Sequence, residues 1–142
     1  MIAVDANLLV YAHRRDASFH ARAVDVVRSL AEGSTPWGIP WPCVHEFLAI
    51  VTHPRIFRTP SPLDAAIAQV SAWRESPALR FLAEEDGYWE VLCRIATVAR
   101  VAGAKLHDAR IAAIARQHEV TELLSADRDF SRFADLRVRN PL

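Results

Sequence analysis

Four acidic residues lie where buried strands end or apolar helices run, and their carboxylates could together hold a divalent cation. Asp5 follows the apolar run at residues 2–4, Glu46 interrupts an apolar helical stretch, and Asp108 and Asp127 lie close to the starts of later helices. Two carboxylates 4 Å apart repel by about 4 kcal/mol at an effective dielectric near 20. Several of them can therefore share a pocket only with protons or a cation. Oxygen ligands without Cys suit hard ions such as Mg²⁺ or Mn²⁺, which typically act on phosphates.

Helix capping offers another explanation for three of these acids. Asp5 could accept hydrogen bonds from the helical turn that follows it, and Asp108 would interact favourably with the positive end of its helix. Ser125 or Asp127 could cap a short helix in the segment SADRDFSRF. Glu46 has no such role, although it could lie on a helix edge that faces water. The prediction of a metal site therefore depends on the four acids as a set.

The elements that would position these acids alternate between strand and helix. Helical periodicity predicts helices at 19–32, 43–53, 61–73, from Asp86 to near Gly103, and from about Leu106 to 118. Apolar runs predict strands at 2–4, around 37–42, at 78–83, at 121–125 and around 136–140. Such alternation favours an α/β fold with a parallel sheet and helices on both faces. Ligands in such folds bind beyond the carboxyl ends of the strands, at a topological switch point.

Length and composition indicate one globular domain over residues 1–142. The chain has 17 basic and 17 acidic residues, so no overall basic field attracts nucleic acid, and RNA binding would depend on local patches or on metal. Cys43 and Cys93 lie far apart, without the spacing of a zinc clip or a disulfide framework, which favours a reducing cytoplasm. We expect no signal peptide and no membrane span.

Five segments carry a resemblance to a known family. They are VDANLLVYA at 4–12, PWPCVHEFLAIVTHPRIF at 40–57, KLHDARIAAIA at 105–115, SADRDFSRF at 125–133, and the ending LRVRNPL. In this order they resemble the PIN-domain ribonucleases, and more narrowly the VapC-type toxins of type II toxin–antitoxin pairs, over essentially the whole chain. The resemblance implies a single PIN-like domain with a central parallel sheet of about five strands flanked by helices. It also implies a Mg²⁺ or Mn²⁺ site that cleaves RNA (tRNA, rRNA or mRNA) endonucleolytically with water as the nucleophile. The implied partners are a VapB-like antitoxin and a second copy of the chain.

The resemblance also assigns roles to individual residues. The four acids of the family's site match Asp5, Glu46, Asp108 and Asp127, which would be both metal ligands and catalytic residues. Asn7 matches the polar residue that supports the first acid, and Ser125 resembles a hydroxyl that either orients a metal-bound water or caps a helix. Asp129 is the alternative to Asp127 as the fourth acid of the site.

Other residues near these motifs have weaker indications. His45 and His107 each neighbour a proposed ligand, and we expect them to be structural or to face RNA rather than to be catalytic. The four tryptophans lie in apolar patterns, which favours packing in the core or at an interface over base stacking. They are Trp37, Trp41, Trp73 and Trp89.

Three rival functions share parts of the pattern. A phosphate-transfer enzyme with an aspartyl nucleophile would have a second Asp where this chain has Asn7. A receiver-type signalling domain needs a Lys near its last strands, whereas Lys105 is the only Lys. A catalytically weak RNA- or protein-binding module of the same fold is the main alternative, and the complete set of four acids favours the enzyme over it.

Overall fold

The computed structural model describes all residues 1–142 and contains one five-stranded parallel sheet. The strands are β1 (Ile2–Val4), β2 (Trp37–Pro40), β3 (Leu79–Leu82), β4 (Glu122–Leu124) and β5 (Arg137–Arg139). Their order across the sheet is β3-β2-β1-β4-β5, and every neighbouring pair is parallel. The predicted α/β class and the predicted number of strands are therefore confirmed.

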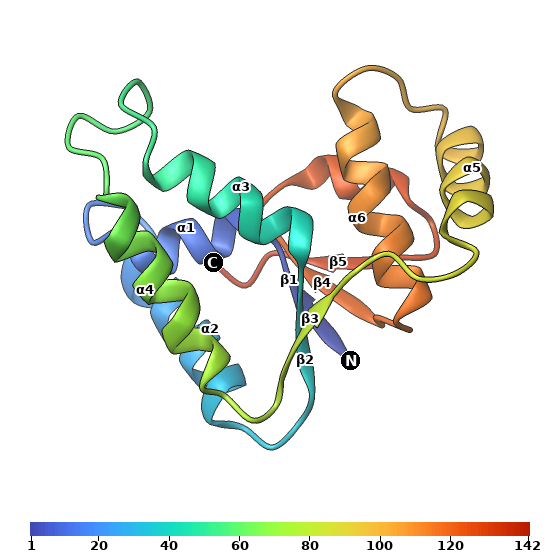
Figure 1. Cartoon of the computed structure of the whole chain (residues 1–142). Coiled ribbons are helices and arrows are strands. Elements are labelled where there is room, and N and C mark those ends of the chain that lie inside the picture. The colour runs from blue at the N-terminus through green and yellow to red at the C-terminus, as the bar shows by residue number, and fades with distance from the viewer.

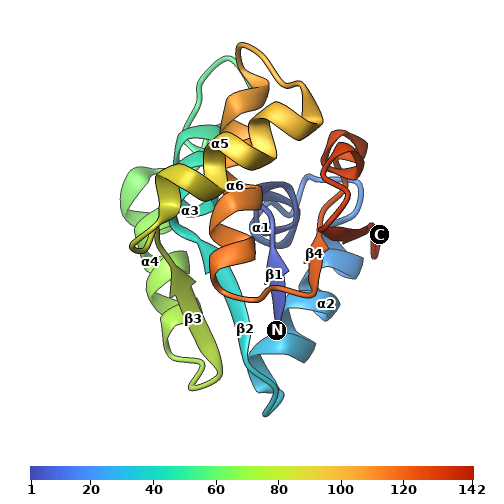
Figure 2. The same cartoon turned by 90° about the vertical axis from the view of Figure 1, so that its right-hand side faces the viewer.

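Six α-helices and one short 3₁₀ helix surround this sheet. They are α1 (Ala6–His13), α2 (His20–Glu32), α3 (Trp41–Val51), α4 (Leu63–Arg74), α5 (Tyr88–Ala99), α6 (Lys105–Gln117) and the 3₁₀ helix η1 (Arg128–Arg132). Figures 1 and 2 show α1 to α4 on one side of the sheet and α5 with α6 on the other. No helix is both long enough and apolar enough to cross a membrane.

The strand order places a topological switch point beside β1. From β1 the chain moves outward through β2 to β3, and it then crosses back to β4 on the opposite side of β1. The carboxyl ends of β1, β2 and β4 consequently lie at one edge, from which α1, α3 and η1 continue. In open α/β sheets this edge is where ligands bind.

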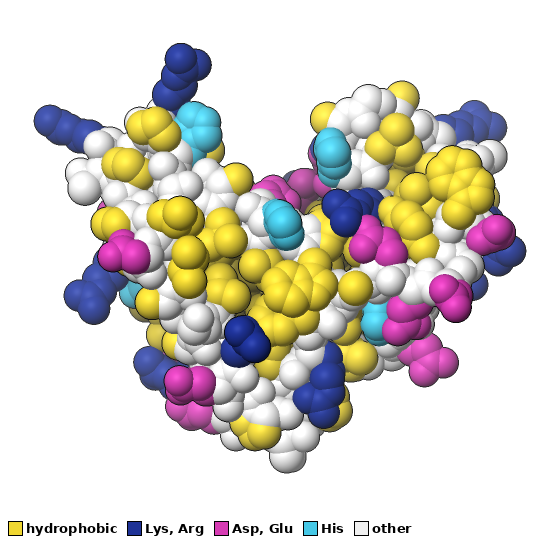
Figure 3. Space-filling view, in the orientation of Figure 1, with side chains coloured by type: hydrophobic (Ala, Val, Ile, Leu, Met, Phe, Trp, Pro, Cys, Tyr) yellow, Lys and Arg dark blue, Asp and Glu magenta, His cyan; other side chains and the backbone are white.

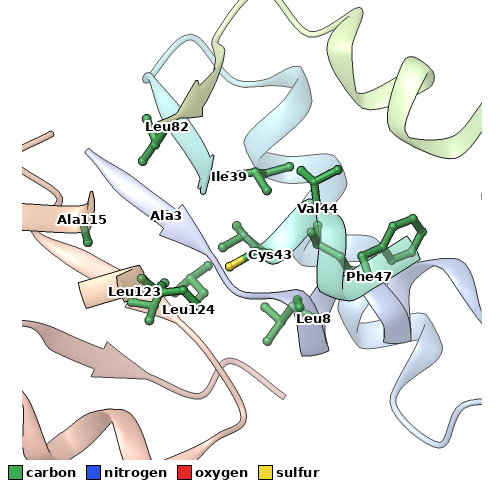
Figure 4. Close-up of a cluster of buried hydrophobic side chains, with 14 of the residues drawn as sticks. Ala3, Leu8, Ile39, Cys43, Val44, Phe47, Leu82, Ala115, Leu123 and Leu124 are labelled. Atoms are coloured by element: carbon green, nitrogen blue, oxygen red, sulfur yellow. The ribbon is translucent and has the colours of Figure 1, made fainter. Parts of the chain in front are cut away.

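A continuous core fixes the relative positions of these strand ends. Figure 4 shows side chains of β2, β3 and β4 meeting those of α1 and α3 around the central strand. Gly38 in β2 leaves room for this packing, because a Cβ there would lie 2.7 Å from Cδ1 of Leu82 and would displace that side chain. Trp37 and Trp73 are buried, as the apolar pattern predicted for both.

Most helix boundaries differ from the prediction by a few residues, and the backbone explains both differences at α5. Helix α5 begins at Tyr88 rather than at Asp86, because Gly87 adopts a left-handed conformation with φ of 80° just before it. The same helix ends at Ala99 rather than near Gly103, because the next residue, Arg100, adopts the left-handed conformation. Backbone geometry at these two residues, which the periodicity could not reveal, sets both ends.

Two apolar side chains of the outer helices point to solvent. Trp89, whose apolar pattern favours packing in the core or at an interface, is 68% exposed, and Ile67 on α4 is 50% exposed. Helix α4 has no side-chain cap, although Ser61 lies just before it. The Ser61 hydroxyl instead bonds to Nε2 of His13 and accepts from Arg14. A long-range contact has here replaced the local one.

Candidate metal centre

The four predicted acids meet at the carboxyl edge of the sheet. Asp5 follows β1 directly, Glu46 lies in α3 beyond β2, Asp108 lies in the first turn of α6, and Asp127 follows β4. A hollow of about 570 Å³ opens here, and Figure 3 shows it between the two arms of the molecule. Its lining consists of Trp41, Pro42, His45, Glu46, Ala104, Lys105, His107, Asp108, Arg110, Ile111 and Asp127. Asp5 does not line the hollow and is only 4% exposed.

Asp5 is held by hydrogen-bond donors on both carboxylate oxygens. Oδ1 accepts from the backbone N–H of Ala6 at 2.8 Å, which makes Asp5 the N-cap of α1, and from Sγ of Cys43 at 3.5 Å. Oδ2 accepts from Nδ2 of Asn7 and from the Ser125 hydroxyl, each at 2.7 Å. Asp5 is therefore the predicted N-cap of α1, and the same buried carboxylate lies close enough to Glu46 for its charge to contribute to the raised pKa of that acid.

Asn7 and Ser125 join the ends of β1 and β4. The buried Ser125 hydroxyl donates to Asp5 and accepts from Nδ2 of Asn7 and from the backbone N–H of Asp127, each at 3.0 Å. The amide oxygen of Asn7 accepts from the backbone N–H of Ala126 at 3.0 Å. These contacts put Asn7 in the supporting position expected for it. They also tie the loop that carries Asp127 to Asp5.

Loss of solvent, together with repulsion between the carboxylates, raises the pKa values of three of the acids. Burial raises the pKa of the Asp5 carboxyl, and hydrogen bonds from Ser125, Ala6 and Cys43 offset part of that shift. Desolvation raises the pKa of Glu46, with further contributions from the negative charges of Asp5, Asp108 and Asp127. The pKa of Asp108 is also raised, first by desolvation. The pocket therefore favours a bound cation.

The contacts of Lys105 distinguish Asp127 from Asp129, the two candidates for the fourth acid of the site. Its ammonium group pairs with Asp129 and lies 3.6 Å from Oδ2 of Asp108. The ion pair with Lys105 lowers the pKa of Asp129, whose side chain is 47% exposed. Asp127 lines the hollow, whereas Asp129 does not. The geometry favours Asp127 over Asp129 as the acid that faces a metal.

The candidate metal ligands suit a hard cation, although their side chains do not converge on a single point. No group of three or more His, Cys, Asp or Glu side chains stands at metal-ligand spacing. Mg²⁺ does not require such a group, because it keeps several waters and often binds only one or two carboxylates directly. Carboxylate oxygens, without an exposed thiol, line the hollow. The residues therefore fit Mg²⁺ or Mn²⁺ better than a thiolate-binding metal.

We expect the metal-free protein to be stabilised when Glu46 is replaced by Gln. A carboxyl group whose pKa is raised by folding binds more protons in the folded state, so stability falls as pH rises from the ordinary value of 4.5 through the raised one. Glu46→Gln should raise Tm at pH 7 by roughly 1–3 °C, since exposed charge interactions contribute up to about 1 kcal/mol. The gain should vanish near pH 4.

Thermal unfolding in EDTA at both pH values measures this effect. Glu75→Gln is the matched control, because Glu75 is exposed and lies outside the hollow. An equal gain from both variants would show that the other acids do not act on Glu46.

Some residues of the hollow were not assigned to it from the sequence. Trp41 was expected to pack in the core or at an interface, yet it is 39% exposed and lines the hollow. Lys105 was considered only as evidence against a receiver-type signalling domain. Its contact with Asp129 is a long-range pairing, for which the sequence carries no local signal. Cys43 points its thiol at Asp5 from the first turns of α3.

Comparisons with known proteins agree with this architecture. The family model described as PIN domain matches residues 2–136. Ribonuclease VapC43 of Mycobacterium tuberculosis is 37% identical over 142 residues, which cover all of this chain and 96% of that protein. Ribonuclease VapC48 of the same organism is 31% identical over 96% of this chain and 94% of its own length.

Solved structures with lower sequence identity share the fold. The M. tuberculosis toxin VapC20, described as cleaving the sarcin-ricin loop, superposes with a TM-score of 0.70 at 18% identity, over 99% of this chain and all of that one. VapBC2 of Rickettsia felis, solved bound to a promoter DNA fragment, gives 0.72 at 16% identity, over 99% of this chain and 98% of that one. These two likenesses concern the fold alone.

Proposed function

This chain belongs to the PIN domain family, and within it to the VapC ribonucleases, and we propose that it is an endoribonuclease toxin whose four carboxylates hold its metal. The observation that carries the proposal is the meeting of Glu46, Asp108 and Asp127 in one hollow, near the buried Asp5, whose charge contributes to the raised pKa of Glu46. Ribonucleases of this family generally use a divalent metal. We propose Mg²⁺, with Mn²⁺ as an active substitute.

The residues around the hollow would have different roles in the reaction. A bound divalent ion would supply Lewis acidity to the scissile phosphate and lower the pKa of the attacking water. Glu46, Asp108 and Asp127 would hold it from the walls of the hollow. Asp5 would complete the site, in an orientation that Asn7 and Ser125 maintain through their hydrogen bonds to Oδ2.

Cations at the rim would bind the RNA backbone. Lys105 and Arg110 line the hollow, where their charges can contact phosphates on either side of the cut. Arg110 is paired with Glu84, and Lys105 with Asp129, so both side chains are held near the rim. With no overall basic field on the chain, these local charges and the metal supply the attraction for RNA.

Cleavage of an RNA in Mg²⁺ tests this function. We expect internal cuts that stop in EDTA and return when Mg²⁺ or Mn²⁺ is restored. Because water is the nucleophile, the fragments should lack the 2′,3′-cyclic phosphate that forms when the RNA's own 2′-hydroxyl attacks. Sequencing and end analysis of the fragments measure both properties. An Asp108→Asn preparation, purified in the same way, controls for contaminating ribonucleases.

Binding without cleavage would contradict the proposal and favour the catalytically weak binding module. So would cyclic phosphate ends or cleavage that persists in EDTA. Equal cutting by the Asp108→Asn preparation and by an Asp127→Asn preparation purified in the same way would assign the activity to a contaminant.

The partners follow from the same family membership. We propose a VapB-like antitoxin and a homodimer as the functional assembly, consistent with relatives solved as VapBC and FitAB complexes. Leu63 and Ile67 on α4 and Trp89 and Val98 on α5 are exposed apolar side chains available for such contacts.

A further inference from the structure

An aromatic pair lies at the wall of the hollow, next to the acids. The rings of Trp41 and Phe81 stack with centroids 4.5 Å apart and planes 19° from parallel. Trp41 is the first residue of α3, and Phe81 lies in β3, the strand beside β2. Figure 3 shows hydrophobic side chains gathered at the foot of the hollow, over the start of α3 and over β3. The pair is therefore anchored on two regular elements rather than on a loop.

Trp41 keeps an open surface although it is stacked. Phe81 covers one face of the indole ring, and yet 39% of Trp41 remains exposed while the residue lines the hollow. Pro40 and Pro42 flank Trp41, and the fixed φ of proline limits the backbone on both sides. An aromatic face that is rigidly held and open to solvent is the usual platform for an unpaired base.

Trp41 and the acids are placed so that one RNA strand can contact both. The ring and the carboxylates of Glu46, Asp108 and Asp127 line the same hollow. Along the axis of α3, Trp41 precedes Glu46 by five residues, a rise of about 7.5 Å, and stacked nucleotides in one strand are about 3.4 Å apart. A base on Trp41 and a phosphate at the acids would therefore belong to nearby nucleotides of one strand.

The composition of the wall favours RNA over an apolar protein segment. His45, Lys105 and Arg110 line the same hollow as Trp41, together with the acids. An apolar segment seated there would remove these polar groups and the acids from water without offering them hydrogen bonds, which is costly. A nucleotide offers a ring for Trp41 and a phosphate for the cations and the metal.

Resting on the proposed ribonuclease function, we propose that Trp41, backed by Phe81, stacks an unpaired base beside the scissile phosphate. The substrate at the cut is consequently a strand whose base is free to leave its neighbours. Stacking accepts any base, so Trp41 supplies affinity and placement, while the choice of sequence is left to other contacts.

Trp41→Ala should lower kcat/KM for RNA cleavage in Mg²⁺ by about 5- to 150-fold, the range measured for loss of one base–aromatic stack. Trp41→Phe keeps a ring and should restore most of the activity. Phe19→Ala is the matched control, because Phe19 is also an exposed ring paired with another aromatic, Tyr11, but lies outside the hollow, and it should leave cleavage unchanged. Thermal unfolding and light scattering on each variant report fold and oligomeric state.

An abasic substrate separates stacking from a structural role. Once the cut has been mapped in an oligoribonucleotide, an abasic nucleotide is placed in turn at each of the two positions on either side. At one position the wild type should lose about as much activity as Trp41→Ala loses on the intact strand, and Trp41→Ala should lose little more there.

Additive losses at every position would overturn the proposal. So would a Trp41→Ala protein that cleaves normally. A change in oligomeric state that accompanies additive losses would assign Trp41 to a protein contact instead. If the wild type fails to cleave any RNA in Mg²⁺, the proposed function itself fails, which is a different result from normal cleavage by Trp41→Ala.

Discussion

Asp127→Asn is expected to reduce Mg²⁺-dependent RNA cleavage by at least about 100-fold, comparable to the removal of a main electrostatic group from an active site. Asp127 lines the hollow, and its charge raises the pKa values of both Glu46 and Asp108. Asn keeps a side-chain oxygen for the backbone N–H of Asp129, which Asp127 Oδ1 accepts at 2.8 Å. The 3₁₀ helix should therefore form as before.

Asp129→Asn is the matched control for this substitution, two residues along the same loop. We expect the cleavage rate to change by less than about 3-fold. Asp129 is exposed and pairs with Lys105 rather than lining the hollow, and an exposed ion pair contributes less than about 1 kcal/mol. Lys105 would then be free to approach Asp108. Steady-state cleavage rates of the two variants, with circular dichroism to verify the fold, measure the difference. A larger loss in Asp129→Asn than in Asp127→Asn would place the fourth acid at residue 129.

The strands of the sheet could be predicted from the sequence because parallel strands buried on both faces are continuous apolar runs. The runs at Ile2–Val4 and Glu122–Leu124 were predicted almost to the residue. Helix ends were less predictable. They depend on the backbone conformation of single residues, such as Gly87 and Arg100 at the two ends of α5.

The capping and ligand explanations of the acids could not be separated by local sequence, because they do not exclude one another. Asp5 caps α1 with Oδ1, and its other oxygen accepts from Asn7 and Ser125. Asp127 likewise caps η1 while it lines the hollow. A rule based on neighbouring residues can identify the helix cap but not the position of the same side chain at the hollow. Only the strand order brings the four residues to one edge.

The tryptophans illustrate a second limit of sequence patterns. All four lie in apolar surroundings, but Trp37 is fully buried, whereas Trp41, four residues later, is 39% exposed. The change occurs where β2 ends and α3 begins, so that Trp41 projects from the first turn of a helix at the edge of the sheet. Periodicity within one element carries no information on such a junction.

Asp5→Asn should abolish cleavage and also destabilise the fold, in contrast to substitution of the other acids. Asp5 is buried and accepts from donors only: Ala6 N–H and the Cys43 thiol at Oδ1, and Asn7 and Ser125 at Oδ2. An Asn side chain has only one oxygen. Its NH₂ group would therefore take the place of the other carboxylate oxygen and face hydrogen-bond donors that it cannot accept from. Each buried group left unsatisfied costs about 1–3 kcal/mol. We expect Tm to fall by roughly 3–9 °C.

Asp108→Asn provides the comparison that separates chemistry from stability at this site. Asp108 is partly exposed, its nearest charged partner is Lys105 at 3.6 Å, and its pKa is raised, so a neutral amide there costs the metal-free fold little. It should lose at least about 100-fold in cleavage with an unchanged or higher Tm. Thermal unfolding in EDTA and cleavage in Mg²⁺ on both variants measure the contrast. If Asp5→Asn kept its Tm, the four-donor network would not stabilise the fold. If Asp108→Asn kept its activity, Asp108 would not be a metal ligand, and the site would have to be rebuilt around the remaining acids.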